Sequence, residues 1–139
     1  MVELNTWHRG RLIDHIQLVV TDFDGCRRFY SAVFDALGVP YTDMSEDGYL
    51  FADELFISKG EPTTGRTHLA FQAADHEAVK RFYEAALAAG GRDNGEPGIR
   101  EYHPGYYAAF VLDPEGNNIE AVCHGPAKRS APSVEITDA

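Results

Sequence analysis

The sequence has few cysteines and no long hydrophobic segment. Only two cysteines occur among 139 residues, which is too few for a disulfide framework. No apolar run approaches the length of a membrane span, and the first residues lack the apolar stretch of a secretory signal. These features argue against a secreted disulfide-rich protein and against a membrane protein. They predict a cytoplasmic protein whose two cysteines are buried free thiols.

Basic residues are also scarce. Twelve lysines and arginines are outnumbered by 22 aspartates and glutamates, so the formal net charge is −10. This surplus would repel a phosphate backbone, and we expect no nucleic-acid partner. Hydrophobic residues make up 44% of the chain, which is enough for a packed core in one domain.

The chain contains an internal repeat with a spacing of 53 residues. Under this shift the segment HIQLVVTD, from His15, aligns with HLAFQAAD, from His68, and eight residues between positions 15 and 38 are identical. Many of the other aligned pairs exchange one apolar residue for another. The sequence therefore predicts a duplicated module, with copies at about 12–60 and 66–124 and a loose tail at 125–139.

Each copy has the pattern of a strand, a helix and three further strands. Asp22 and Asp75 are expected N-caps, and apolar residues at helical spacing follow both. Gly38 and the pair at 90–91 should end the helices. We place the strands at 12–20, 40–43, 48–52, 54–59, 67–74, 92–94, 105–112 and 117–124.

Three potential metal ligands share the strand face that points away from the helices. Strand alternation puts His15, His68 and Glu120 on this face. His15 and His68 are equivalent positions of the repeat, and a pseudo-twofold axis would place such positions opposite one another. Two histidines and a carboxylate suit a divalent ion such as Fe, Mn, Ni or Zn, with positions open for substrate.

The chain resembles the vicinal oxygen chelate superfamily, which includes glyoxalase I, extradiol dioxygenases and bleomycin-resistance proteins. The resemblance covers residues 12 to about 124 and is carried by four segments: DHIQLVVTD, RRFYSAVFDALG, THLAFQAAD and AAFVLDPEGNNIEAV. It implies an α+β fold of two βαβββ modules that form a cup-shaped, mixed eight-stranded sheet with the helices outside. It also implies that His15, His68 and Glu120 are metal ligands.

The resemblance leaves the fourth ligand and the reaction type open. Either Glu54 or Phe56 occupies the position where isomerases and lyases of the family carry a further glutamate. His103 lies about where the dioxygenases have a histidine, but Phe110 replaces their tyrosine. Tyr106, on the same predicted face, could supply a phenol instead.

The remaining candidates lie on the segment before the seventh expected strand and within that strand. Arg100, Tyr106 and Phe110 are expected to bind substrate, with Arg100 holding a carboxylate or phosphate. Glu120, if displaced from the metal, or His103 would move a proton. The sequence thus predicts a metal-dependent homodimeric enzyme that acts on a small molecule with adjacent oxygens. The alternative is a non-catalytic, drug-binding protein, for which the negative charge would suit a cationic ligand.

Overall fold

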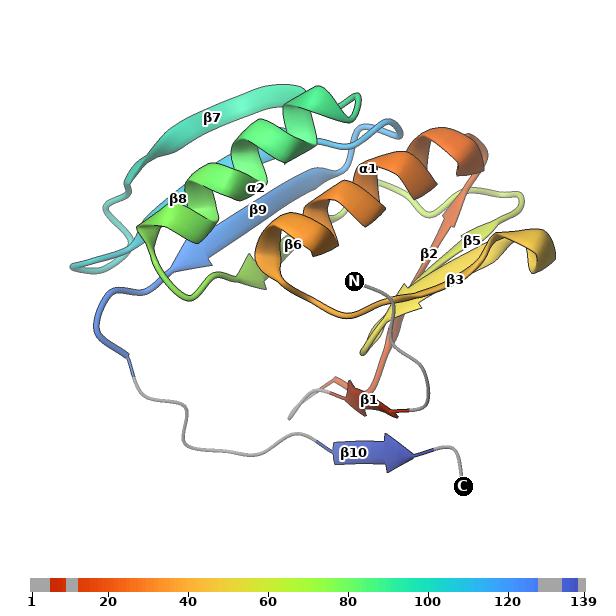
Figure 1. Cartoon of the computed structure of the whole chain (residues 1–139). Helices are drawn as coiled ribbons and strands as arrows, with labels where there is room; N and C mark the ends of the chain where they lie inside the picture. The colour runs from red at the N-terminus through yellow and green to blue at the C-terminus, as the bar shows by residue number, and fades with distance from the viewer. Residues whose placement is uncertain (1–5, 10–12, 128–133, 138–139) are drawn as a thin grey trace.

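The computed structural model describes residues 6–9, 13–127 and 134–137 (Figure 1). Two βαβββ modules account for most of them. Module 1 comprises β2 (Ile16–Val20), α1 (Phe23–Leu37), β3 (Thr42–Met44), β4 (Tyr49–Ala52) and β5 (Leu55–Lys59). Module 2 comprises β6 (His68–Gln72), α2 (His76–Ala88), β7 (Arg92–Ile99), β8 (Tyr107–Leu112) and β9 (Asn118–Cys123). Neither α-helix in the described part of the chain is long and apolar enough to cross a membrane.

The strands of each module form their own mixed sheet. The order is β2-β5-β4-β3 in module 1 and β6-β9-β8-β7 in module 2, and in both sheets the first strand runs parallel to the last. The predicted α+β fold is therefore confirmed. The eight strands, however, are divided between two open sheets and do not hydrogen-bond into a single sheet.

Both helices begin where the sequence indicates and α1 also ends there, whereas α2 ends at Ala88 with Ala89 as its C-cap, directly before the glycine pair 90–91. The Asp22 carboxylate accepts a hydrogen bond from the Gly25 amide at 3.0 Å, and Asp75 accepts one from Ala78 at 2.8 Å. Gly38 ends α1 with a left-handed φ of 71°, a conformation that costs glycine nothing because it has no Cβ. The capping residues thus fix the length of the helices.

The helices cover one face of each sheet and form the core with it. Leu18, Ile57, Ile119 and Ala121 point from the strands toward the helices and are fully buried. Phe29, Val33 and Phe34 of α1 and Val79, Phe82 and Ala86 of α2 are buried with them. Cys26 and Cys123 are buried free thiols, as expected. The opposite faces of the sheets, which point away from the helices, are available for binding.

The two modules are related by a pseudo-twofold axis that passes between the helices, which lie side by side in Figure 1. The Arg28 guanidinium donates to the carbonyl oxygen of Ala89 at 3.4 Å, and Arg81 donates to that of Ala36 at 3.3 Å. Arg28 and Arg81 are equivalent under the repeat, and so are Ala36 and Ala89. The same contact is therefore made twice, in opposite directions.

The turn between β8 and β9 also joins the modules. The Asp113 carboxylate is 1% exposed and accepts hydrogen bonds from the Asn117 amide and, at 2.5 Å, from the Tyr30 hydroxyl of α1. Glu115 accepts from the backbone amides of Thr21 and Asp22, directly before α1. Burial and the neighbouring Asp113 carboxylate raise the pKa of Tyr30 well above its usual value, so it stays a donor.

Two predictions were wrong, one about the end of a strand and one about the C-terminal tail. β7 continues to Ile99, well beyond the expected end at 94, because bulges around Gly95 let the strand keep pairing with β8. The tail is not wholly loose, since β10 (Val134–Thr137) pairs antiparallel with β1 (Thr6–Arg9). The alternation of Val134 and Ile136 with polar residues was the signal for this strand.

Candidate functional site

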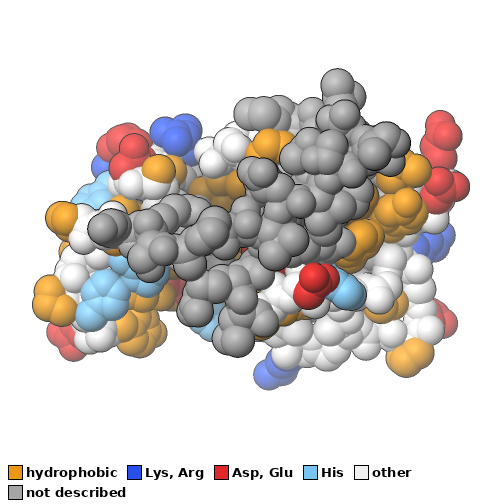
Figure 2. Space-filling model, turned by 90° about the horizontal axis from the view of Figure 1, so that it is seen from below, with side chains coloured by type: hydrophobic (Ala, Val, Ile, Leu, Met, Phe, Trp, Pro, Cys, Tyr) orange, Lys and Arg blue, Asp and Glu red, His pale blue; other side chains and the backbone are white. Residues whose placement is uncertain are grey.

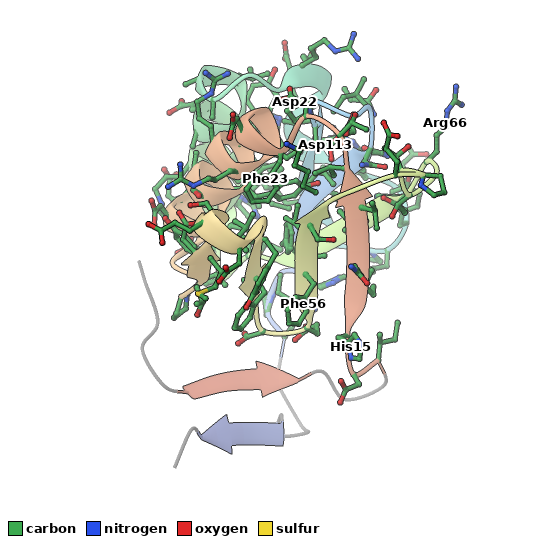
Figure 3. All side chains as sticks on the ribbon, turned by 90° about the vertical axis from the view of Figure 1, so that its right-hand side faces the viewer. His15, Asp22, Phe23, Phe56, Arg66 and Asp113 are labelled. Atoms are coloured by element: carbon green, nitrogen blue, oxygen red, sulfur yellow. The ribbon has the colours of Figure 1, made fainter. Side chains whose placement is uncertain are left out.

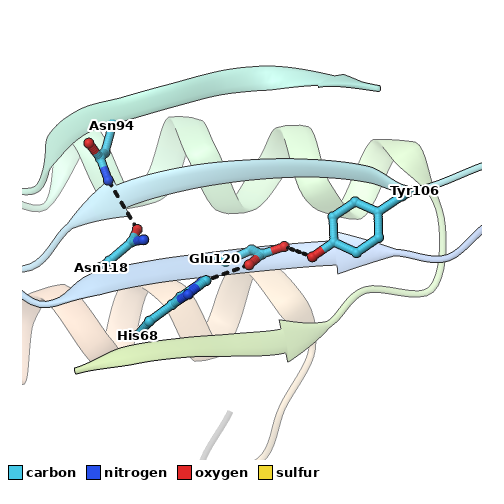
Figure 4. A network of polar contacts seen from close by, with 5 residues as sticks. All are labelled: His68, Asn94, Tyr106, Asn118 and Glu120. Atoms are coloured by element: carbon cyan, nitrogen blue, oxygen red, sulfur yellow. Dashed lines mark hydrogen bonds and ion pairs between the residues drawn. The ribbon is translucent and has the colours of Figure 1, made fainter. Parts of the chain in front are cut away.

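The face of module 2 that points away from α2 carries most of the predicted site residues. Cross-strand pairing aligns Ala70, Glu120 and Phe110 in one row across β6, β9 and β8. The neighbouring row contains His68 and Asn118. Paired residues point to the same face of a sheet, so these side chains lie together. Figure 4 shows His68 and Glu120 meeting from adjacent strands.

His68 and Glu120 form the centre of this face. His68 Nε2 lies 2.8 Å from Glu120 Oε1. The Glu120 side chain is 2% exposed, whereas that of His68 is 52% exposed. Burial of a carboxylate is unfavourable unless it is hydrogen-bonded or bound to a cation. The pair therefore places an imidazole nitrogen against a carboxylate oxygen, with the imidazole half-exposed and the carboxylate buried behind it.

Tyr106 holds the other oxygen of the same carboxylate. Its hydroxyl donates to Glu120 Oε2 (Figure 4). Burial and, next, this hydrogen bond to Glu120 raise the pKa of Tyr106 to about 12. A phenolate here would lie against a carboxylate, so the neutral donor is favoured. Tyr106 thus fixes the orientation of Glu120.

Further predicted residues line the edge of this face. The Phe110 ring centroid lies 5.9 Å from that of His68, and the Arg100 guanidinium lies 5.3 Å from the centroid of Phe110. Arg100 also donates to the carbonyl oxygen of Glu96 at 2.7 Å. The structure therefore places Arg100 and Phe110 beside the His68–Glu120 pair, on the side toward β7.

His103 belongs to an aromatic cluster on the loop between β7 and β8. Its Nε2 lies 2.9 Å from His124 Nδ1, and its Nδ1 lies 2.9 Å from the carbonyl oxygen of Pro104. Since a carbonyl only accepts, Nδ1 of His103 carries the proton, and Nε2 accepts from His124 when His103 is neutral. The Tyr106 ring packs edge-on against both imidazoles. Seen from below, histidine and hydrophobic side chains gather at this end of the molecule (Figure 2).

His15 lies in a different environment on module 1. Its Nδ1 is 2.6 Å from Asp14 Oδ1, and its ring centroid is 6.3 Å from that of Phe56. Phe56 stacks on Phe51 at 4.7 Å, so this face is aromatic where module 2 is polar. His15 and Phe56 lie near the same end of the first sheet (Figure 3).

Strand register decides which residue of module 1 corresponds to Glu120. Glu120 pairs with Ala70, two residues after His68. In module 1 the residue two positions after His15 pairs with Phe56. Phe56, and not Glu54, therefore occupies the position equivalent to Glu120.

The structure brings together two of the three predicted metal ligands. Within the described part of a single chain, no group of three His, Cys, Asp or Glu side chains is arranged to hold a metal ion. His68 and Glu120 are in contact, while His15 is on the other sheet. The predicted three-ligand site stays a prediction.

Sequence reasoning missed two polar residues near the candidate site. His124 was not singled out, although its parity with Glu120 places it on the same strand face. Asn118 was not singled out, although it pairs with His68 and accepts a hydrogen bond from the Asn94 side chain at 3.1 Å (Figure 4). In both cases strand alternation was the available signal.

Comparisons with known proteins agree with this architecture. A family model described as the Glyoxalase/Bleomycin resistance protein/Dioxygenase superfamily matches residues 12–121. No curated protein matches the chain. A solved glyoxalase/bleomycin resistance protein from Albidiferax ferrireducens is 28% identical, with a TM-score of 0.69 over 81% of this chain and 98% of that chain.

Two more distant structures share the fold. The fosfomycin resistance protein FosX from Mesorhizobium loti has a TM-score of 0.58 and 21% identity, over 79% of this chain and 89% of that chain. A glyoxalase I variant from Zea mays has a TM-score of 0.53 and 23% identity, over 84% of this chain and 45% of that chain. At this identity the likeness concerns the fold alone.

Proposed function

The chain belongs to the Glyoxalase/Bleomycin resistance protein/Dioxygenase superfamily, and on this premise we propose that it is a metal-dependent enzyme acting on a small molecule with two adjacent oxygens. One observation carries the proposal. His68 Nε2 and Glu120 Oε1 meet at 2.8 Å on the face of module 2 that points away from α2, with the carboxylate otherwise buried. Imidazole and carboxylate are the donors expected for a first-row divalent ion.

The donor set fits a metal if a second copy of the chain completes it. His68 and Glu120 supply two ligands, and His15, the repeat equivalent of His68, would supply the third from the partner in a homodimer. The contact between His15 Nδ1 and Asp14 supports this role, because a carboxylate on one imidazole nitrogen orients the other toward a metal. With Phe56 at the fourth position, the site would have three protein ligands.

A divalent cation bound there would supply Lewis acidity to two substrate oxygens. The Tyr106 hydroxyl would keep Glu120 oriented by donating to Oε2. Arg100, held over the Phe110 ring, would stabilise negative charge on the bound oxygens, and Phe110 would shield them from water. His103 would take up a proton at Nε2, the nitrogen that now accepts a hydrogen bond from His124. The cytoplasmic location stays a prediction.

A non-catalytic small-molecule-binding protein is the second candidate. It is favoured by the lack of a three-donor group within the described part of one chain. The two candidates differ in metal content, which plasma mass spectrometry of the purified protein measures. The enzyme proposal requires about one divalent ion per chain and its loss in His68→Ala and Glu120→Gln. His76→Ala, which removes an imidazole stacked on Tyr107 away from this face, is the matched control and should retain the metal.

Mixing two defective variants tests whether the site is shared. His15→Ala and Glu120→Ala should each abolish tight metal binding. In a twofold dimer with free subunit exchange, an equal mixture should regain about a quarter of the wild-type metal, since each mixed dimer has one intact site. No recovery of metal in a mixture refolded together from the two variants, or a protein that light scattering shows to be monomeric, overturns the shared-site proposal.

A further inference from the structure

Two arginines stand apart from the others in this acidic chain. Among the arginines whose side chains the structure describes, four have a partner: Arg27 with Asp43, Arg28 with Ala89, Arg81 with Ala36 and Arg100 with Glu96. The side chains of Arg66 and Arg92 have no hydrogen bond or ion pair among the described residues. Both are exposed, in a chain where 22 acidic residues outnumber 12 basic ones.

Both unpaired arginines line the same hollow. It has a volume of about 530 Å³, and its lining also includes Thr67, Asn118 and Glu115. Glu115 is the one carboxylate in this lining, and its Oε1 already accepts hydrogen bonds from Thr21 and the Asp22 amide. The hollow therefore has more positive than negative charge, the reverse of the chain as a whole. Arg66 extends outward at the edge of the molecule in Figure 3.

The hollow is next to the candidate metal centre, because Asn118, which lines it, pairs with His68. Cross-strand pairing sets Arg92, Leu112, Asn118 and His68 in one row across the four strands of module 2. Neighbouring strands are about 4.8 Å apart, which separates the backbones of Arg92 and His68 by roughly 14 Å. Asn118, between them, accepts from Asn94 through Oδ1 and keeps its amide N–H groups as donors. A ligand on His68 can therefore extend along this row to Arg92.

We propose that this hollow is an oxyanion subsite that binds a phosphate or phosphonate group of the substrate. Guanidinium groups pair with such groups through two parallel charge-assisted hydrogen bonds, and a dianion can engage both arginines. The assignment rests on the proposed function, because it places the subsite next to the metal centre. The substrate then carries its adjacent oxygens at His68 and Glu120 and a phosphate-type group within roughly 14 Å of them.

Titration calorimetry of the full-length protein with inorganic phosphate, at constant ionic strength, tests the subsite. Wild type should bind phosphate at one site per chain and more tightly than acetate. Arg92→Ala and Arg66→Ala should each weaken binding by about tenfold, since each loses a charge-assisted contact. Arg27→Ala is the matched control, because Arg27 pairs with Asp43 at 2.8 Å and does not line the hollow. Arg92→Lys should keep part of the affinity through its charge.

Failure of the subsite and failure of the proposed function give different results. The arginine variants should retain the metal, whereas His68→Ala should lose the metal and still bind phosphate. Phosphate binding without any bound metal would leave the subsite standing and overturn the metal-dependent enzyme. Absence of saturable phosphate binding, equal loss in Arg27→Ala, or tighter binding of acetate would each overturn the subsite.

Discussion

The two modules have kept the same helix packing but carry different chemistry on the sheet faces that point away from the helices. Arg28 and Arg81 make equivalent contacts to the opposite helix. On the sheet faces, His68 meets the Glu120 carboxylate, while His15 meets the Phe56 ring at the equivalent position. Residues at the contact between modules constrain each other, whereas residues on the open faces were able to diverge. The open faces are therefore where the two modules differ most.

The largest loss of stability is expected from a substitution in the turn between β8 and β9, which has no counterpart of the same length in module 1. β4 and β5 are joined by two residues, whereas the turn from Asp113 between β8 and β9 is longer and holds the modules together. Asp113→Ala should lower the free energy of unfolding by roughly 3 kcal/mol, because it leaves several buried donors unpaired. Tyr30→Phe, which removes one of those donors, should cost about 1 kcal/mol. Urea denaturation measures both, and equal losses would contradict this role of Asp113.

The second largest loss of stability is expected at Tyr106, which orients the buried Glu120 carboxylate of module 2. Tyr106→Phe should destabilise the fold by about 2 kcal/mol, since Glu120 loses a donor. The exposed Tyr102→Phe should have no effect. The pKa of Tyr106 is raised to about 12, so its contribution should be present below the ordinary tyrosine pKa and be lost as pH rises through about 12. A titration followed by ultraviolet absorbance should show one late-titrating tyrosine fewer in the variant than in the wild type.

A smaller effect is expected from giving module 1 the carboxylate of module 2. Phe56→Glu should raise metal affinity by about tenfold if His15 of the same module contributes to the shared site. Phe51→Glu is the control, because it adds the same charge and disrupts the same ring stack one strand further from His15. Competition with a chelator gives the affinities. An equal gain in both variants would indicate a general effect of negative charge.

The smallest losses of stability are expected at the two equivalent contacts between the helices, in which Arg28 donates to Ala89 and Arg81 donates to Ala36. Arg28→Ala and Arg81→Ala should each cost roughly 0.5–1 kcal/mol of unfolding free energy, the usual net value of such a hydrogen bond. The two losses should be alike, because the contacts are equivalent. Thermal denaturation at matched concentration would show whether one module depends on its contact more than the other.

Local features of the fold were predictable from the sequence, whereas long-range contacts were not. The repeat and the capping residues Asp22 and Asp75 gave the modules and helices, and strand alternation placed His68 and Glu120 on one face. The meeting of Asp113 and Tyr30 was not predictable, because 83 residues separate them and no local pattern records the contact.

The expectation that His15 and His68 face one another within one chain depended on where the twofold axis lies. Such an axis brings equivalent residues together only if they are close to it, and here it passes between the helices. Arg28 and Arg81 are near it, while the two histidines lie on separate sheets. Alternation gives the face of a residue but not its distance from an axis.

The contact of Glu115 with the start of α1 sets an order for folding. Thr21 and Glu115 are separated by 94 residues, yet the Glu115 carboxylate accepts from the amides of Thr21 and Asp22. On a ribosome, α1 is complete long before its partner turn has been synthesised. Closing so long a loop is entropically costly and slows folding. The first half of the chain must therefore wait for the second, and we expect neither half to reach its native state when expressed alone.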